Sequence, residues 1–226
     1  MNAPHQLNSP PSSLLRKILA CFSQDWLVLL PDLYRALHLW FKRHRHEGMY
    51  EILDYDATLE LVDPKGKTAI FTKRQRVKFL QDHIIAFQDY AWGDGEIFAN
   101  YNCTPGSEVD HYQEGDRWNI LISLRETKNS GDIEDFYIER TAKEGFITAE
   151  ESLQTEIRHR TRRLRMSIIF PKRRPCKRAL LLERSRNRTT VLGPEHFIDL
   201  PDGRQRLTWE TSTIRGFEIY TIKWKW

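Results

Sequence analysis

Residues 50–79 read YEILDYDATLELVDPKGKTAIFTKRQRVKF, and this stretch decides the class of fold. Apolar and polar residues alternate along both of its halves, which is typical of β-strands that turn one face toward a core. The middle, Asp63-Pro64-Lys65-Gly66, collects residue types that favour tight turns. Residues 51–62 and 67–79 are therefore predicted to form two antiparallel strands joined by a turn with a bulge.

The same alternation continues toward the end of the chain. Roughly nine to eleven strands with frequent turn signals indicate an antiparallel β-sandwich or barrel over residues 49–226. Only one short helix is expected in this domain, near residues 148–153. The last strand, which ends in Trp224 and Trp226, is expected to belong to the core. Further strands are predicted over residues 84–90, 118–124, 134–141, 164–170, 179–183, 205–210 and 217–226.

The first part of the chain has a different pattern. Residues 1–11 are polar and proline-bearing and predict a disordered tail, and residues 12–48 predict a small helical unit. The unit carries one amphipathic stripe at helical spacing. Three interpretations of this unit are open. It could pack on the β-domain or self-associate, it could contact an anionic membrane surface, or it could form a helix-turn-helix. The stripe consists of Leu30, Leu33, Leu37, Trp40 and Phe41.

Composition excludes several classes of protein. Hydrophobic residues make up 40% of the chain, which is enough to build a core. The sequence has no run of 18 apolar residues, so no membrane-spanning helix is predicted. The first residues show no basic region that leads into an apolar one, so no secretory signal is expected. Three cysteines without a Cys-x-x-Cys pair do not form a disulfide framework. A cytoplasmic location follows from this interpretation.

Charge is divided sharply between two segments. Residues 158–188 hold thirteen Lys or Arg and one acid, whereas residues 104–151 hold twelve acids and five bases. Such a basic segment can follow a phosphate backbone or bind an acidic protein. It can equally be a solvated strand face that is paired with the acidic segment of the same chain. The candidate contacts for an anionic partner are Arg158, Arg160, Arg163, Arg165, Arg173 and Arg174.

A second candidate site lies in the polar, glycine-bearing stretch from residue 92 to residue 118. Aromatic side chains with a few polar groups are typical of a small-molecule pocket, and the same composition is typical of a long connection at a sheet edge. The candidate pocket residues are Trp92, Asp94, Tyr101, Asp110, His111 and Trp118.

Motifs for catalysis are missing from the sequence. It contains no GxSxG, HExxH, GxxxxGK[ST] or GxGxxG pattern, and Cys103 and His111 have no spacing that supports a nucleophile–base pair. His44 and His46 stand two residues apart on a predicted helix, where side chains do not face each other. No catalytic residue, metal site or cofactor is therefore predicted.

These observations favour a non-enzymatic recognition or regulatory module. It would present the basic segment to nucleic acid or an acidic protein, and its helices would support a homo-oligomer. Two alternatives remain open. One is a sensor or enzyme that uses the 92–118 stretch to bind a nucleotide or metabolite, and the other is a peripheral membrane protein anchored by the helices.

Overall fold

The computed structural model describes residues 48–93 and 95–226. The predicted tail and nearly all of the predicted helical unit lie outside these residues. The amphipathic stripe lies outside them as well. The roles predicted for it, in self-association, membrane contact or a helix-turn-helix, therefore concern residues that the structure does not describe.

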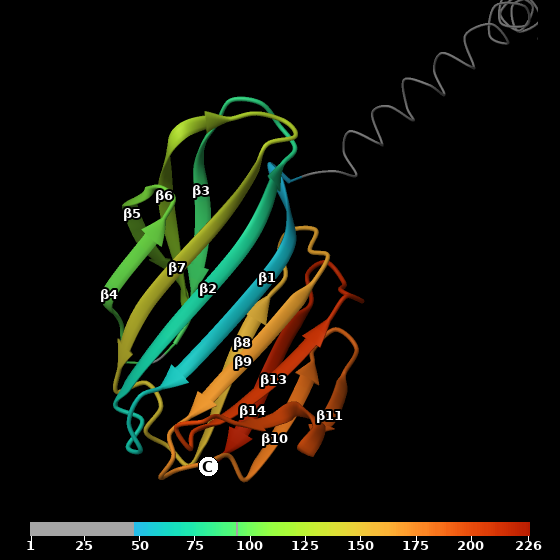
Figure 1. Ribbon diagram of the computed structural model, residues 1–226. Coiled ribbons are helices and arrows are strands. Elements are labelled where there is room, and N and C mark those ends of the chain that lie inside the picture. Colours follow the sequence, from blue (N-terminus) through green and yellow to red (C-terminus); the bar gives the residue numbers. More distant parts are fainter. Residues whose placement is uncertain (1–47, 94) are drawn as a thin grey trace, which may run out of the picture. The chain divides into compact units, whose positions relative to one another are not determined.

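The described part of the chain consists mainly of β-strands arranged in three sheets, with one 3-10 helix at Pro194–His196 (Figure 1). The strands are β1 (Tyr50–Leu61), β2 (Thr68–Phe79), β3 (Ile84–Ala91), β4 (Glu96–Thr104), β5 (Ser107–Glu114), β6 (Arg117–Lys128), β7 (Ile133–Lys143), β8 (Glu150–Glu156), β9 (Leu164–Phe170), β10 (Arg178–Glu183), β11 (Arg188–Leu192), β12 (Phe197–Asp199), β13 (Gln205–Thr211) and β14 (Ile219–Lys225).

The largest sheet has seven strands in the order β12-β13-β9-β1-β2-β7-β4. A four-stranded sheet, β11-β10-β14-β8, and a three-stranded sheet, β3-β6-β5, complete the fold. In Figure 1 the large sheet crosses the front of the domain, and the two smaller sheets lie behind different parts of it. The prediction of a mainly β, sandwich-like fold with antiparallel sheets is confirmed.

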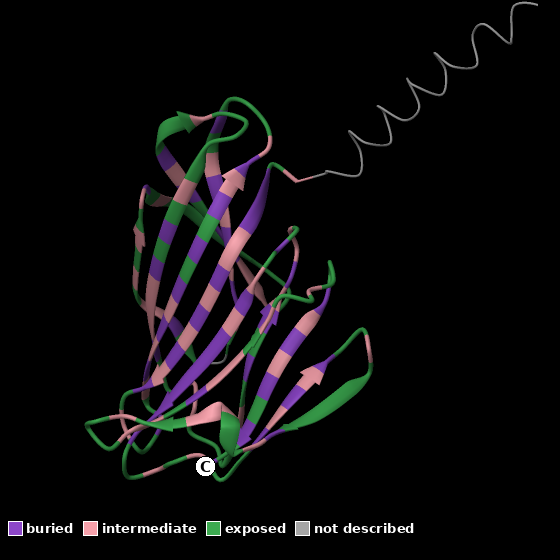
Figure 2. Cartoon of the chain, turned by 45° about the vertical axis from the view of Figure 1, so that its right-hand side comes forward, coloured by how far each residue is buried: buried purple, intermediate pink, exposed green. Residues whose placement is uncertain are grey.

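Burial alternates along the strands as the sequence predicts. In β2 the residues at odd positions from 69 to 79 are buried, and the residues between them are partly or fully exposed. Figure 2 shows the same banding on neighbouring strands of the large sheet. Because the side chains of a strand point alternately to its two faces, each strand gives one row to the core and one to the solvent.

The predicted hairpin is present, with β1 and β2 paired antiparallel from Tyr50↔Phe79 to Leu61↔Ala69. Asp63 holds the turn, because its carboxylate accepts hydrogen bonds from the backbone N–H groups of Lys65 and Thr68, both at 2.8 Å. Gly66 has a φ of +71°, and a Cβ at this position would collide with the carbonyl group of Phe146. The turn therefore requires glycine here.

One strand pair departs from the predicted antiparallel arrangement. β1 and β9 pair in parallel, from Tyr55↔Leu164 to Glu60↔Ile169. Parallel neighbours need a long crossover connection, and here β2 to β8 supply it. A pairing between segments this far apart leaves no local mark in the sequence, so the expectation of a purely antiparallel domain was wrong at this pair.

Two further expectations are corrected. The stretch after Trp92 is no long loop but contains β4 and β5, and most β5 side chains are exposed, which explains the polar composition. The helix expected near residues 148–153 is replaced by β8, in which Leu153 and Thr155 alternate inward between more exposed residues. The strand count also exceeds the predicted one, partly because these short or polar strands lack a clear apolar alternation.

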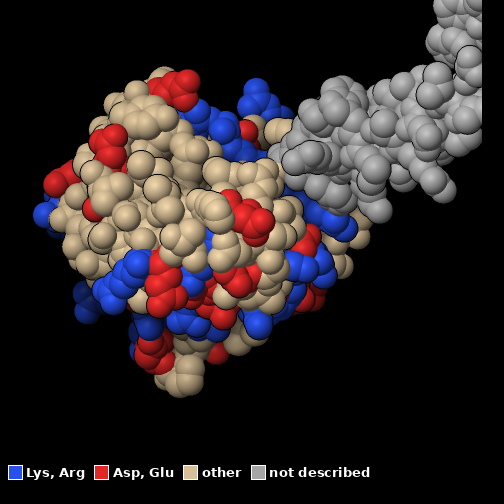
Figure 3. Space-filling view, turned by 90° about the horizontal axis from the view of Figure 1, so that it is seen from above, with Lys and Arg blue, Asp and Glu red and all other residues tan. Residues whose placement is uncertain are grey.

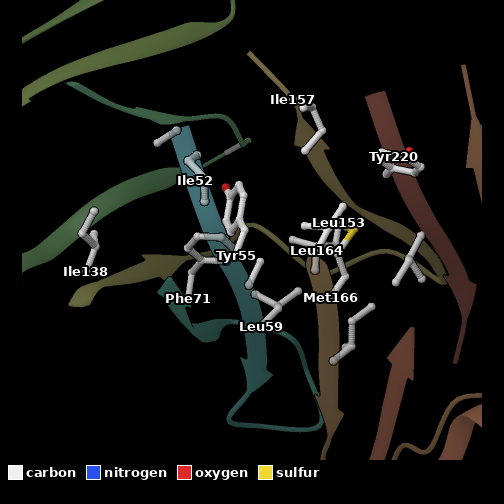
Figure 4. Packing of buried hydrophobic residues seen from close by; sticks show 14 of the residues in the cluster. Ile52, Tyr55, Leu59, Phe71, Ile138, Leu153, Ile157, Leu164, Met166 and Tyr220 are labelled. Atoms are coloured by element: carbon white, nitrogen blue, oxygen red, sulfur yellow. The ribbon is translucent and has the colours of Figure 1, made fainter. Parts of the chain in front are cut away.

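The core lies between the sheets. Figure 4 shows Tyr55 and Leu59 of β1 on the large sheet, and across from them Leu153 of β8 and Tyr220 of β14. The indole of Trp224 on β14 is 1% exposed and packs against the aromatic rings of Phe146, Phe170 and Trp226. The last strand is thus part of the core, as its aromatic residues predict.

Residues 48–93 and 95–226 contain no helical segment with the length and hydropathy of a membrane span.

Replacement of Ile222 by alanine should lower the free energy of unfolding by about 2–5 kcal/mol, because Ile222 on β14 is fully buried and its loss leaves a cavity. Chemical denaturation measures this change. The matched control is Ile198→Ala on β12, where the side chain is 60% exposed and the expected cost is at most about 1 kcal/mol. Equal effects of the two variants would contradict the placement of β14 in the core.

Candidate functional site

Three charged residues occupy strand positions that face the core. Lys73 on β2, Asp89 on β3 and Arg140 on β7 each stand on an inward row, with apolar neighbours two residues away on at least one side. A buried charge is costly unless it is paired and hydrogen-bonded. Their contacts therefore decide what this interior can bind.

Lys73 and Asp89 form a buried ion pair that joins the large sheet to the three-stranded sheet. Their side chains are only 4% and 5% exposed, and the Lys73 ammonium donates to Asp89 Oδ1 and, at 3.0 Å, to the carbonyl oxygen of Tyr90. Burial is the largest influence and opposes the charged form of Lys73, but the charge of Asp89, its hydrogen bond and the nearby Tyr55 together outweigh burial and raise the pKa of Lys73 above its usual value. Lys73 therefore stays protonated.

Two tyrosines surround this pair. The hydroxyl of Tyr101 on β4 donates to Asp89 Oδ2 at 3.2 Å. Burial raises the pKa of both Tyr55 and Tyr101, and the negative charge of Asp89 adds to the effect. Both phenols consequently remain protonated, and that of Tyr101 acts as a hydrogen-bond donor to Asp89.

Arg140 differs from Lys73 because no carboxylate of the described residues pairs with it. Its Nη1 and Nη2 atoms donate to the carbonyl oxygens of Ile97 at 3.4 Å and Trp92 at 3.2 Å. The guanidinium carbon lies 4.7 Å from the centre of the Phe71 ring, close enough for a cation–π contact. Burial lowers the pKa of Arg140, and Asp89 and the two tyrosines oppose this change. A guanidinium stays charged under such conditions.

A cavity of about 210 Å³ adjoins Lys73 and Arg140. Residues from all three sheets line it, because β1, β2 and β7, the end of β3 and the middle of β8 meet there. Its walls are rich in aromatic side chains. These are Tyr55, Phe71, Tyr90, Trp92 and Phe146.

Two acidic residues also line this cavity. Asp116 is exposed to solvent, and the half-buried Glu151 accepts hydrogen bonds from the backbone N–H and the hydroxyl of Thr148. Neither carboxylate pairs with Arg140. Thr148 binds Glu151, Asp116 lies in solvent, and the guanidinium of Arg140 has no carboxylate partner among residues 48–93 and 95–226.

A smaller cavity of about 30 Å³ shares Tyr55, Lys73, Tyr90 and Trp92 with the first. Gln75 Oε1 and His159 Nε2 are both buried, belong to residues that line it, and have no hydrogen-bond partner in the described structure. Burial, and then the charge of Arg158, lowers the pKa of His159. The polar interior thus extends from Arg140 past Lys73 to His159.

The predicted pocket residues take different places. Trp92 lines the cavity, and Tyr101 contacts Asp89. The rings of His111 and Trp118 both pack near Phe98, with ring centres 5.6 Å and 5.4 Å from it, outside the cavity. Asp110 is exposed on β5, and Asp94 lies outside the described residues.

The structure brings two of the six predicted arginine contacts, Arg163 and Arg165, together on the outer face of the large sheet. Arg163 and Arg165 contact Glu210 of β13 at 3.0 Å and 3.1 Å, and each also faces an acid of β1. Asp56 of β1 stands in register between Arg165 of β9 and Arg74 of β2. Neighbouring strands thus carry opposite charges.

The other arginines divide into paired and unpaired residues. Arg158 pairs with Glu156 at 2.9 Å, and Arg160 lies 3.8 Å from Glu51. Arg174 covers the ring of Trp226 at 3.7 Å and donates to two backbone carbonyls. Among the described residues, the acids that neutralise the basic segment come from β1, β8, β10 and β13, and none comes from residues 104–151.

Unpaired positive charge gathers in a second place, which we call the basic loop. Four exposed side chains beside the start of β10 form no ion pair within the described part of the chain: Lys172, Arg173, Lys177 and Arg178. Elsewhere the two signs are mixed, and Figure 3 shows acidic and basic side chains next to one another over the face that it presents.

The described residues offer little for metal or nucleophilic chemistry. Between residues 48 and 226, leaving out residue 94, no three His, Cys, Asp or Glu side chains gather as metal ligands would. Burial raises the pKa of the Cys103 thiol, and raises that of Cys176 to about 11. Both thiols stay protonated at neutral pH, which makes them poor nucleophiles.

The chain matches no family model and no curated protein. Solved structures with a similar arrangement include the M1 zinc metallopeptidase from Deinococcus radiodurans, with 9% identity and a TM-score of 0.45 over 79% of this chain and 43% of that one. Another is aminopeptidase A from Legionella pneumophila in complex with aspartic acid, with 12% identity and a TM-score of 0.46 over 78% and 21%. The chain thus spans less than half of the length of these proteins.

The strand alternation in the sequence already marks the buried ion pair, although the predicted site residues do not include it. The alternation of β2 that predicts Phe71 and Val77 as core residues also places Lys73 and Gln75 on the same inward row. The same argument applies to Asp89 between Phe87 and Ala91. A charged residue on a core-facing row is the pattern that marks this site.

Replacement of Asp89 by asparagine should destabilise the domain by about 3–5 kcal/mol, because it leaves the buried Lys73 ammonium without its counter-charge. Denaturant unfolding measures the loss. The matched control is Glu144→Gln, which breaks an ion pair with Lys67 whose side chains are 55% exposed, and should cost about 0–1 kcal/mol. A similar small loss for both variants would show that the buried pair contributes no more to the free energy of unfolding than the exposed one.

Proposed function

We propose that the β-domain is a non-enzymatic binding module that holds a small organic molecule in the cavity between its three sheets. The observation that supports this most directly is the cavity itself, which combines aromatic walls with two cationic side chains, Lys73 and Arg140. Small-molecule sites are typically concave, largely apolar, and provided with a few convergent polar groups.

The size of the cavity limits the ligand. Apolar cavities of about 150 Å³ accept a benzene molecule. A cavity of about 210 Å³ therefore suits one aromatic ring with a short substituent, and is small for a nucleotide. The ring would lie against the side chains of Trp92, Phe71 and Phe146.

The bonding of the polar groups favours binding over catalysis. Asp89 accepts hydrogen bonds from both Lys73 and Tyr101, so its carboxylate is already occupied. Lys73 is held in its charged form and is no free base. Groups fixed in this way provide a constant electrostatic environment, which suits recognition of a ligand better than transfer of a proton.

One-ring aromatic compounds should raise the thermal midpoint of the domain and bind measurably by calorimetry, and Trp92→Ala should abolish both effects because it removes a cavity wall. Suitable probes are indole, phenylacetamide and phenylacetate. The matched control is Trp209→Ala, since Trp209 packs on Tyr220 and lines neither cavity. Absence of binding by every probe, or equal loss in both variants, would refute the proposed site.

A second candidate function is contact of the basic segment with nucleic acid or an acidic protein. The observation that favours it is the basic loop, whose four cations find no partner within residues 48–93 and 95–226. Arg173 belongs to both this loop and the predicted contacts. The other predicted contacts are engaged with acids or carbonyl groups of their own chain, which reduces the charge that they offer to a partner.

If this second function holds, charge reversal at Arg173 and Lys177 should weaken binding to single-stranded RNA or DNA and reduce the salt dependence of the affinity, with the logarithmic slope changing by about 0.7 for each lost phosphate contact. Fluorescence anisotropy across a salt series measures this. Charge reversal at Arg163 and Arg165 serves as comparison, because Glu210 already pairs with both. No binding at low salt would exclude nucleic acid as the partner.

A further inference from the structure

We propose that the ligand of the cavity is a monocarboxylate with an aromatic or apolar body, and that its carboxylate binds to Arg140. This inference rests on the proposed function, and it adds the chemical class of the ligand and the residue that selects it.

The first argument is the balance of charge. Lys73 and Asp89 pair with each other, and no carboxylate of residues 48–93 and 95–226 contacts Arg140, whose charge is therefore unpaired in this part of the chain. A half-buried guanidinium that has lost water without gaining a counter-charge is poorly stabilised. A single anionic group placed beside it would complete the pairing.

The second argument is the number of free donors. A guanidinium has five N–H groups, and the described residues accept hydrogen bonds from only two Arg140 nitrogens. Both acceptors are backbone carbonyl oxygens, and one face of the guanidinium is covered by Phe71. Further N–H groups remain for the forked pairing that arginine forms with carboxylates.

The third argument concerns the negative charges near the cavity. The exposed Asp116 and Glu151 of β8 both line the cavity. Each carboxylate would repel an additional anionic group. Arg140 can pair with one anionic group, and among the described residues that line the cavity Lys73 is already paired with Asp89, so a second negative charge on the ligand would meet Asp116 and Glu151 without a further cation to offset the repulsion. This selects a monocarboxylate over a phosphate monoester or a dicarboxylate.

The aromatic side chains that line the cavity indicate what the uncharged part of the ligand should be. Phe71, Trp92 and Phe146 supply aromatic surface within the same cavity, whose volume suits one ring. Phenylacetate has this composition: one ring, one short linker and one carboxylate. Phenylacetamide has nearly the same shape without the charge, which makes the two compounds a matched pair.

Isothermal titration calorimetry on the full chain provides the test. Phenylacetate should bind at least ten-fold more tightly than phenylacetamide, and benzylphosphonate, which carries more charge at pH 8, should bind more weakly than phenylacetate. Arg140→Met should remove the preference for phenylacetate over phenylacetamide, whereas Arg140→Lys should keep part of it. The matched control is Arg74→Met on the outer face, which should leave the preference unchanged.

The outcomes separate the two proposals. Equal affinity of the wild-type chain for phenylacetate and phenylacetamide would overturn the role of Arg140 and leave the binding function standing. Absence of binding by both compounds would overturn the role of Arg140, and absence of binding by indole as well would overturn the binding function. The wild-type comparison of the two compounds decides the matter even if Arg140→Met does not fold, and retention of the full preference in a folded Arg140→Met variant would also overturn the proposal.

Discussion

The ion pair between Lys73 and Asp89 connects two sheets that share no strand pairing in the described part of the chain. Apolar packing between sheets is non-directional, so many relative positions would bury similar areas. A buried charged pair with further bonds to Tyr90 and Tyr101 tolerates only one of them, because any shift leaves a charge unpaired. The position of the three-stranded sheet, and with it the shape of the cavity, depends on this contact.

The two faces of the large sheet differ in how their charged residues are paired. On the outer face, acids of β1 stand between basic residues of β2 and β9, and these pairs remain in contact with water. Such pairs contribute little to stability but keep the surface well solvated. On the inner face only a few charges of the described residues are present, each is costly, and Arg140 stands out because no carboxylate among these residues pairs with it.

Local patterns in the sequence were enough to predict much of the fold. The alternation along residues 50–79 and the turn at Asp63 define the first hairpin, and Trp224 and Trp226 mark the last strand as part of the core. The polar strands β4 and β5 escaped prediction because exposed strands carry no apolar alternation. The inward positions of Lys73 and Asp89 were readable from their own strands, whereas the pairing of the two residues was not, since contact between sheets has no local signal.

The parallel pairing of β1 with β9 also has a consequence for the order in which the domain can assemble. Asp54 and Arg163, which meet across this pair, are 109 residues apart in the chain. During synthesis, β1 to β7 can form hairpins while one edge of β1 stays open until β9 has been made. An open strand edge is a site for wrong pairing with other chains. The acidic outer row of β1, with Asp54, Asp56 and Glu60, gives that waiting edge a like charge in every copy and so discourages such association.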